Sequence, residues 1–400
     1  MKYFLSLIFF SGLLLACTSP QHDQDPDTIA VKPADTLFSE EVIPIKPPVQ
    51  KDTLLDNLAR FIAGLPQLDS NSFTALETDA YWEQFKISMD FNWEKMYKNR
   101  LGKIEHWQDS VFAPLQNDSL VLFYPFSGPD FLHAYYLYPD APVYVLAALE
   151  PIIEVPALDT VRVPKRDHFL DSLGRSLRDI FQKSYFITNH MQKDLKAISG
   201  VLPPLYFFLE RTGHELLRQQ YITLDSAGQE SIVEYKKLHW QTTQGVKLIF
   251  RNLESKKVKT LYYFSASISN GGLRDRPEFV RFISEQAPFN TFVKSASYLL
   301  HNSQFTEIKD IILTHSDNIF QDDTGIPFKD FKKQLNRTVH LFGTYTKPIK
   351  DFGEVRYQPD LDSAYKVSAN RTPLPFSLGY HWGTAQQHYM LVRKTRMETR

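Results

Sequence analysis

Residues 120–150 read LVLFYPFSGPDFLHAYYLYPDAPVYVLAALE, and this stretch decides the fold class. The run at 120–124 is continuously apolar, which is typical of a strand buried on both faces. Residues 127–130, SGPD, favour a turn into a short helix, because Pro fits the first helical position and Asp complements the positive end of the helix dipole. A second apolar run at 143–149 predicts another strand, so the stretch is expected to form a strand–helix–strand unit with parallel strands.

Helix and strand patterns alternate along the rest of the chain. Large apolar side chains three or four residues apart predict helices at 82–96, 169–181, 277–283 and 305–312. Two strand-like runs, 246–251 and 258–267, flank a polar turn and predict a hairpin. We therefore predict an α/β fold with a mixed or mostly parallel sheet and flanking helices, with α+β as the alternative.

The unit at 120–150 resembles the first half of a Rossmann-type domain, as in methyltransferases and nucleotide-binding enzymes. In those domains a Gly-rich turn lets a ligand approach the backbone, and an acid about 20 residues later binds ribose hydroxyls. Glu150 follows Gly128 by 22 residues (150 − 128), which fits this spacing. The fingerprint has two or three glycines where this chain has one. Three alternatives follow: a purely structural unit, a ligand pocket, or a nucleotide-like site. We predict no cofactor.

The carboxyl ends of the strands are where a ligand would bind in such a sheet. A second polar turn, at 322–325, places two acids beside Thr and Gly. Such a turn can hold a hard cation, but adjacent side chains often diverge, so a solvated turn or a helix cap is favoured and no metal site is predicted. The candidate ligand-binding residues are Ser127, Gly128, Asp130, Glu150, Asp322 and Asp323.

No catalytic motif is complete. His214 and Glu215 begin the zinc-peptidase pattern H-E-x-x-H, but Arg218 stands where the second His is required. The S-x-x-K match at 363–366 has none of the companion motifs of penicillin-recognising enzymes. The catalytic residues, and whether the protein is an enzyme at all, therefore stay open.

Two further segments have alternative interpretations. If 294–301 is a helix, Lys294, Ser297 and His301 share one face, which favours an amphipathic surface. The aromatic-rich segment 373–392 suits either a glycan or partner surface or the closing strands of a sheet, and the second interpretation is favoured.

The amino terminus indicates the compartment. Lys2 precedes an apolar run at 4–15, which is too short to span a membrane and has the length of a signal-peptide core. The run ends in Leu-Leu-Ala-Cys, which resembles the lipobox of bacterial lipoproteins. The resemblance implies a signal peptide at 1–16, acylation of Cys17, and outer-membrane sorting, because Thr18 stands where inner-membrane lipoproteins carry Asp.

The domain organisation follows from composition. Residues 17–50 are rich in Pro and Asp and predict a flexible tether, with a surface-export signal after the Cys as the alternative. Residues 51–400 are predicted to form a single globular domain, or two packed halves divided near 200–245. The net charge of −1, from 45 basic and 46 acidic residues, gives no general attraction to nucleic acid. The expected partner is membrane lipid, through acylated Cys17, and the sequence names no protein or glycan partner.

Three functional hypotheses are compatible with these sequence features. The first is a non-catalytic binding or envelope-associated module on a lipid-anchored protein. The second is an extracytoplasmic hydrolase with its site at the strand tips around Ser127, Asp130 and Glu150. The third is a methyltransferase-like Rossmann domain that has lost its cofactor.

Overall fold

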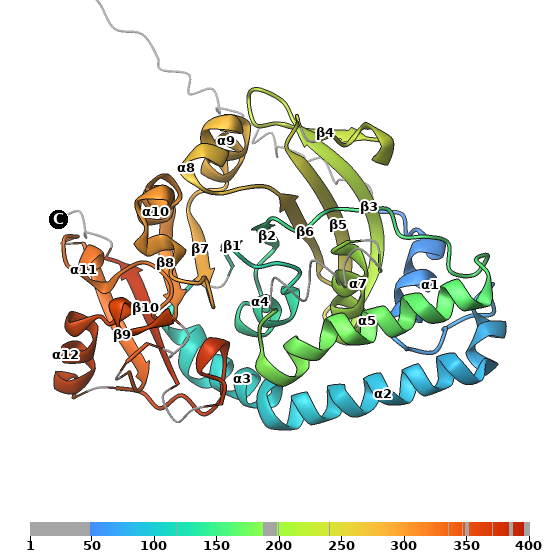
Figure 1. The fold of residues 1–400 in the computed structure, drawn as a ribbon, viewed down its shortest axis with the longest axis horizontal. Coiled ribbons are helices and arrows are strands. Elements are labelled where there is room, and N and C mark those ends of the chain that lie inside the picture. The colour runs from blue at the N-terminus through green and yellow to red at the C-terminus, as the bar shows by residue number, and fades with distance from the viewer. Residues whose placement is uncertain are drawn as a thin grey trace, which may run out of the picture. The chain divides into compact units, whose positions relative to one another are not determined.

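A mixed ten-stranded β-sheet organises the described part of the chain (Figure 1). The computed structural model describes residues 49–395 except 118, 187–197, 199, 240, 335, 346, 349–351, 370 and 384–386. The described residues include neither the predicted signal peptide at 1–16 nor Cys17. Of the predicted tether at 17–50, they include only residues 49 and 50. The strands are β1 (Val121–Pro125), β2 (Val143–Ala148), β3 (His214–Leu224), β4 (Glu230–Val233), β5 (Gln244–Asn252), β6 (Val258–Ser265), β7 (Phe289–Val293), β8 (Ser316–Gln321), β9 (Arg337–Gly343) and β10 (His388–Lys394).

The strand order is β4-β3-β5-β6-β2-β1-β7-β8-β10-β9. The five central strands, β6, β2, β1, β7 and β8, are parallel to one another, and the strands beyond them on both sides pair antiparallel. If β1, β2, β6, β7 and β8 are renumbered 1 to 5 in chain order, their order across the sheet is 3-2-1-4-5. This is the order of the first five strands of a doubly wound sheet. The order reverses at β1, where β2 lies on one side and β7 on the other.

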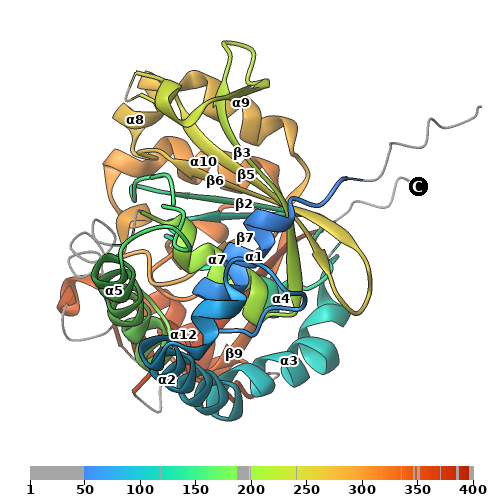
Figure 2. The same cartoon turned by 90° about the vertical axis from the view of Figure 1, so that its right-hand side faces the viewer.

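Helices cover both faces of the sheet, as the two perpendicular views show (Figures 1 and 2). The helices are α1 (Thr53–Ile62), α2 (Ala80–Met96), α3 (Gly102–Trp107), α4 (Phe131–Leu137), α5 (Val163–Lys183), α7 (Leu202–Arg211), α8 (Asn270–Asp275), α9 (Pro277–Glu285), α10 (Thr306–His315), α11 (Phe328–Phe331) and α12 (Pro359–Val367). Helices α1 to α5 and α7 bury their apolar side chains in one core cluster, and α8 to α12 in a second.

Strand β1 shows how the sequence creates these two cores. Leu122 and Tyr124 belong to the first core, whereas Phe123 between them belongs to the second. Successive side chains of a strand point to opposite faces, so a strand covered on both faces must be apolar at every position. The continuous apolar run in the sequence reflects this double burial.

The α/β fold predicted from the sequence is confirmed. β1, α4 and β2 form the expected unit with parallel strands, and β5 and β6 form the expected antiparallel hairpin. The predicted helices correspond to α2, α5, α9 and α10. The segment 373–392 contributes β10, a closing strand between β8 and β9, as the favoured interpretation of its aromatic residues expected.

One conditional prediction is wrong. Residues 294–301 do not form a helix, because Ser295, Ser297 and Tyr298 all adopt positive φ angles between 51° and 55°. The segment is a loop that leaves β7 and closes in the short 3₁₀ turn η6 (Leu299–His301). Lys294, Ser297 and His301 therefore do not form an amphipathic helical face.

Candidate binding pocket

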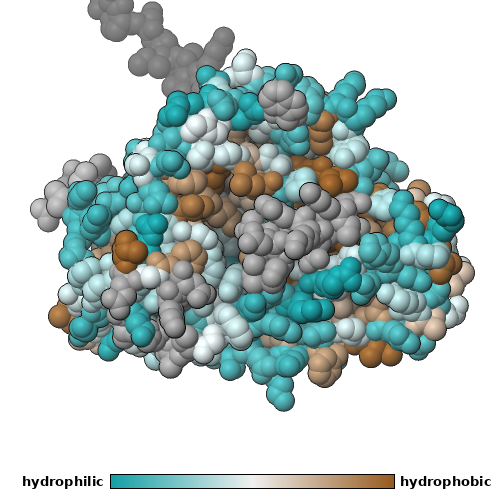
Figure 3. Space-filling view, viewed as in Figure 1, coloured by the Kyte–Doolittle hydropathy of each residue, from teal (hydrophilic) through white to brown (hydrophobic). Residues whose placement is uncertain are grey.

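A pocket lies at the carboxyl ends of β1, β2, β6 and β7, at the point where the strand order reverses. It contains about 930 Å³ of empty space, including the part open to solvent. Figure 3 shows apolar residues, in brown, gathered around a hollow near the middle of one face. This is the location in which open α/β sheets bind their ligands.

Four of the six predicted site residues line this pocket. Ser127 and Gly128 come from the turn after β1, Asp130 lies at its base, and Glu150 follows β2. Gly128 and Glu150 therefore lie at the ends of adjacent strands.

The turn after β1 has an unusual backbone. Phe126 and Gly128 adopt left-handed conformations, with φ angles of 61° and 54°. Gly tolerates this conformation, but a bulky residue such as Phe is strained by about 1–2 kcal/mol. The turn ends at Asp130, the N-cap of α4, whose side chain accepts a hydrogen bond from the amide of His133 (3.2 Å).

Asp130 is the centre of a buried charge cluster. Its Oδ2 lies 2.5 Å from Nζ of Lys294, the residue after β7, and accepts a hydrogen bond from the hydroxyl of Tyr124 (3.0 Å). Its Oδ1 lies 2.9 Å from Nδ1 of His133. Lys294 also donates a hydrogen bond to the carbonyl oxygen of Ser184.

Burial and pairing fix the charge states of this cluster. Burial alone would raise the pKa of Asp130, but His133 and Lys294 hold it well below its usual range. Burial lowers the pKa of His133 to about 4 despite the nearby carboxylate, so the imidazole is neutral at pH 7. Burial also lowers the pKa of Lys294, against the opposing effect of Asp130. The ion pair therefore lies in a nearly dry environment.

The C-terminal end of α5 contributes negative potential to the same region. Arg100 donates hydrogen bonds to the carbonyl oxygens of Ile180 (3.0 Å) and Gln182 (3.2 Å), and Lys294 binds that of Ser184. Cations at a helix C-terminus satisfy carbonyl groups that have no partner within the helix. The helix end thus helps to hold two cations close to a single carboxylate.

The loop after β7 forms another wall of the pocket and carries most of the strained backbone. Six non-Gly residues among those described have positive φ angles, and three of them, Ser295, Ser297 and Tyr298, belong to this loop. Each such residue costs about 1–3 kcal/mol unless its surroundings hold it in place. The loop must therefore be fixed by contacts from outside.

Asp322 and Asp323 supply these contacts and do not line the pocket. Oδ2 of Asp322 accepts a hydrogen bond from the amide of Ser295 (2.9 Å), and Oδ2 of Asp323 accepts one from the hydroxyl of Tyr298 (2.5 Å). Thr324 accepts a further bond from the amide of Ala296 (2.8 Å). The two carboxylates diverge, so this turn braces the loop from behind.

Glu150 is the half-buried acid of the pocket. The hydroxyl of Tyr263 donates hydrogen bonds to its main-chain oxygen (2.9 Å) and to Oε2 (3.3 Å). Burial raises the pKa of Glu150, although the Tyr263 hydroxyl lowers it in part. A carboxylate in this position can accept hydrogen bonds from ligand hydroxyl or amino groups.

The polar groups of the pocket suit binding better than nucleophilic catalysis. Oγ of Ser127 is buried and has no hydrogen-bond partner within the described residues, so no base lies in position to activate it. Asp130 is engaged by three side chains, which leaves it poorly suited to act as a general base. Oγ of Ser295 is likewise buried without a partner in the described part of the chain.

Lys294 is the pocket residue whose role the sequence pattern did not indicate. It lies 164 residues from Asp130 in the chain, and the helical pattern around it suggested an exposed surface. The local sequence before Lys294 is a weak signal, because β7 (FNTFV) is buried but contains the polar residues Asn290 and Thr291 and does not read as a continuous apolar run.

Comparisons of the chain with protein-family models, with curated protein sequences and with solved structures gave no match. Within the part of the chain that the structure describes, no helix is long and apolar enough to cross a membrane.

Proposed function

We propose that the protein is a lipid-anchored envelope protein whose body binds a small organic molecule in the pocket at the β1–β7 switch point. The anchor is Cys17, on the resemblance of its sequence context to a lipobox. Two or three acyl chains attached there give a stable membrane anchor, because each buried CH₂ group contributes about 0.8 kcal/mol.

One observation carries the binding proposal: strained loops converge on the pocket. Four of the six non-Gly residues with positive φ among those described lie in the two loops after β1 and β7, both of which line it. Backbone strain of this kind lowers the stability of the folded protein, and strained residues cluster at ligand-binding and active sites. The loops are held in these conformations by buried polar contacts, which supports a preformed binding site.

The pocket walls define the chemistry of the ligand. Aromatic side chains supply flat apolar surface, and Tyr185 and Tyr380 pack edge to face with ring centroids 4.7 Å apart. The hydroxyl groups of Ser127 and Ser295 have no hydrogen-bond partner among the described residues, and Glu150 adds a carboxylate whose Oε2 accepts a hydrogen bond from Tyr263. A molecule with a flat apolar part and several hydroxyl or amino groups matches this combination.

A nucleoside-type ligand is a second, narrower candidate. The parallel strand order and the position of Glu150 at the tip of β2, beside Gly128 after β1, favour it. In Rossmann-type domains an acid in this position binds ribose hydroxyls. This candidate corresponds to the nucleotide-like alternative for the unit at 120–150 and differs from the hypothesis of a methyltransferase-like domain that has lost its cofactor.

The hydrolase hypothesis is less well supported. Oγ of Ser127 is hydrogen-bonded to no base among the described residues, and the His133–Asp130 pair is buried with its carboxylate also bound to Lys294.

Isothermal titration calorimetry with adenosine, S-adenosylhomocysteine and ribose tests the proposal on the full-length chain. We expect Glu150→Gln to weaken binding of the nucleosides by about 10-fold to 100-fold, because a hydrogen bond to a charged acceptor is lost. Glu254→Gln is the matched control, since Glu254 is exposed in the β5–β6 turn at the other end of the sheet.

The outcomes separate the two candidates. Binding of adenosine that depends on Glu150 supports the nucleoside class. If the nucleosides do not bind, a thermal-shift screen of other hydroxylated aromatic compounds tests the broader proposal, with Ser127→Phe as the variant that fills the pocket. Ligands that bind equally well to the wild type and to Ser127→Phe would place the site elsewhere and overturn the proposal.

A further inference from the structure

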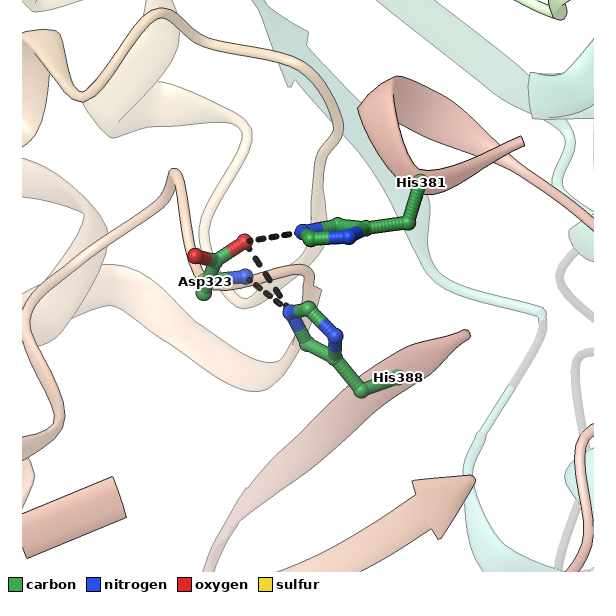
Figure 4. Close-up of side chains that lie close together, drawn as sticks. All are labelled: Asp323, His381 and His388. Atoms are coloured by element: carbon green, nitrogen blue, oxygen red, sulfur yellow. Dashed lines mark hydrogen bonds and ion pairs between the residues drawn. The ribbon is translucent and has the colours of Figure 1, made fainter. Parts of the chain in front are cut away.

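Asp323, His381 and His388 converge in the interior, behind the loop that follows β7 (Figure 4). Asp323 follows β8, His381 ends the 3₁₀ turn η10 (Gly379–His381), and His388 begins β10. Oδ1 of Asp323 lies 3.0 Å from Nε2 of His388 and 3.5 Å from Nε2 of His381. All three side chains are buried, with exposures of 0%, 4% and 2%.

Oδ1 of Asp323 faces Nε2 of both imidazoles at once, so one carboxylate oxygen and two imidazole nitrogens share a single small buried space. The amide of Asp323 donates a long hydrogen bond to Nε2 of His388 (3.3 Å). Nε2 of His388 therefore acts as an acceptor and carries no proton, and the neutral imidazole is the form that binds metals.

The spacing fits a shared metal ion. Nitrogen and oxygen ligands lie about 2.0–2.1 Å from Zn²⁺, so two ligands of a tetrahedral site are about 3.3 Å apart. The two Oδ1–Nε2 distances, 3.0 and 3.5 Å, bracket this value. Two imidazoles and one carboxylate are a donor set that suits zinc and similar divalent transition metals better than Mg²⁺ or Ca²⁺.

The second oxygen of Asp323 is already fixed in the manner expected around a metal ligand. Oδ2 accepts a hydrogen bond from the hydroxyl of Tyr298 (2.5 Å), so the carboxylate is oriented with Oδ1 toward the two imidazoles. Outer hydrogen bonds of this kind orient the ligands of protein metal sites.

We propose that Asp323, His381 and His388 bind one divalent transition metal ion of the zinc class, with a structural role. A buried carboxylate without a cation is costly, and a divalent ion bound here neutralises it. The ion links the turn after β8, the η10 turn and β10. Tyr380, which lines the binding pocket and lies 2.8 Å from Oγ of Ser297, directly precedes His381. The metal thus fastens one wall of the pocket to the sheet.

Metal titration of the full-length chain tests this proposal. The chain is produced without a polyhistidine tag, stripped with a chelator and titrated with ZnCl₂, with bound metal counted by elemental analysis. We expect one equivalent of Zn²⁺ per chain and, at a hundredfold excess over the dissociation constant, a rise in Tm of roughly 5 °C. Co²⁺ in the same site is expected to give the visible absorption of a four-coordinate ion.

Two variants and one control identify the ligands. Asp323→Asn and His388→Gln keep the side-chain volume and are expected to lose the bound equivalent and the shift in Tm. His106→Gln is the control, because His106 is exposed on α3. Circular dichroism of each metal-free variant confirms that it folds.

Several results would overturn the proposal. A wild-type chain that binds no Zn²⁺ or Co²⁺ refutes it, as does a full equivalent of zinc retained by both ligand variants. If the two variants do not fold, the Co²⁺ spectrum of the wild type tests the proposed site instead. A four-coordinate spectrum supports the site, and a six-coordinate spectrum counts against it. None of these readouts involves the pocket ligand, so the metal proposal and the binding proposal fail independently.

Discussion

Replacement of Lys294 by Met removes the cation from the buried cluster while keeping a side chain of similar volume. Both members of the Lys294–Asp130 pair are 2% exposed at the side chain, and Nζ lies 2.5 Å from Oδ2. Loss of one partner from a buried ion pair leaves the other charge uncompensated, which costs about 3–5 kcal/mol. We therefore expect Lys294→Met to lower the free energy of unfolding at pH 7 by about that amount.

Urea denaturation at equilibrium, followed by Trp fluorescence and circular dichroism, measures the change. Lys257→Met is the matched control, because Lys257 pairs with Asp140 at 2.8 Å but the two side chains are 62% and 49% exposed. Pairs this exposed contribute about 0–1 kcal/mol. The double variant Lys294→Met/Asp130→Asn removes the stranded charge and keeps an N-cap, so it should recover about 1–2 kcal/mol of the loss.

The loss should also depend on pH. Asp130 has a lowered pKa in the folded wild type, so its stabilisation is present above its unfolded pKa of about 3.9 and is lost as the pH falls below that value. In Lys294→Met burial is no longer opposed by the ammonium group, and Asp130 takes up a proton at higher pH. The difference between wild type and variant should therefore shrink from pH 7 to pH 4. A loss below about 1 kcal/mol at pH 7, equal to that of Lys257→Met, would refute the reasoning.

Three further predictions follow from other parts of the chain. Cys17→Ser should abolish labelling with a palmitate analogue and release the protein from membrane fractions, and unchanged fractionation would argue against acylation. Burial lowers the pKa values of His133 and His214 to about 4. The unfolded chain takes up protons on these imidazoles below about pH 6.5, whereas the folded protein does so only near pH 4, so the free energy of unfolding is highest above pH 6.5 and falls as the pH drops toward 4. At pH 5 each should lower the free energy of unfolding by about 1–2 kcal/mol, and His214→Leu should flatten this pH dependence in urea titrations. Asp322→Ala removes the acceptor of the Ser295 amide and should reduce stability by about 2 kcal/mol, with faster hydrogen exchange at that amide; unchanged exchange would show that the turn does not brace the loop.

Much of the fold could be predicted because its signals are local. Helix α2 repeats large apolar residues at steps of three and four, and Asp79 caps its first turn through the amide of Tyr81 (2.8 Å). The strands β1 and β2 are apolar at almost every position because both faces of the sheet are covered. The predicted helix start is two residues too early, because Asp130 is the N-cap of α4 and Pro129 precedes this cap instead of occupying the first helical position.

The candidate site could be predicted only in part, because its other half comes from distant segments. Ser127, Gly128, Asp130 and Glu150 lie within one unit of the sequence, and the rule for ligand sites in open sheets places them together. Lys294 joins them through the pairing of β7 with β1, which no local pattern reveals. The helical spacing around it was misleading, because left-handed residues interrupt the segment.

The arrangement of the charges bears on the proposal that the pocket binds a ligand. A site for proton transfer needs a titratable group that is exposed to the substrate and poised near the working pH. Here Asp130 is held ionised by Lys294, and His133 is neutral at pH 7 and fully buried. The charged groups of the cluster thus pair with one another, and these contacts hold β1, β7 and α5 together beneath the pocket. The pocket is lined by aromatic side chains, by Ser127 and Ser295, and by Glu150, and this division between a charged base and a polar, aromatic lining supports the proposal of ligand recognition.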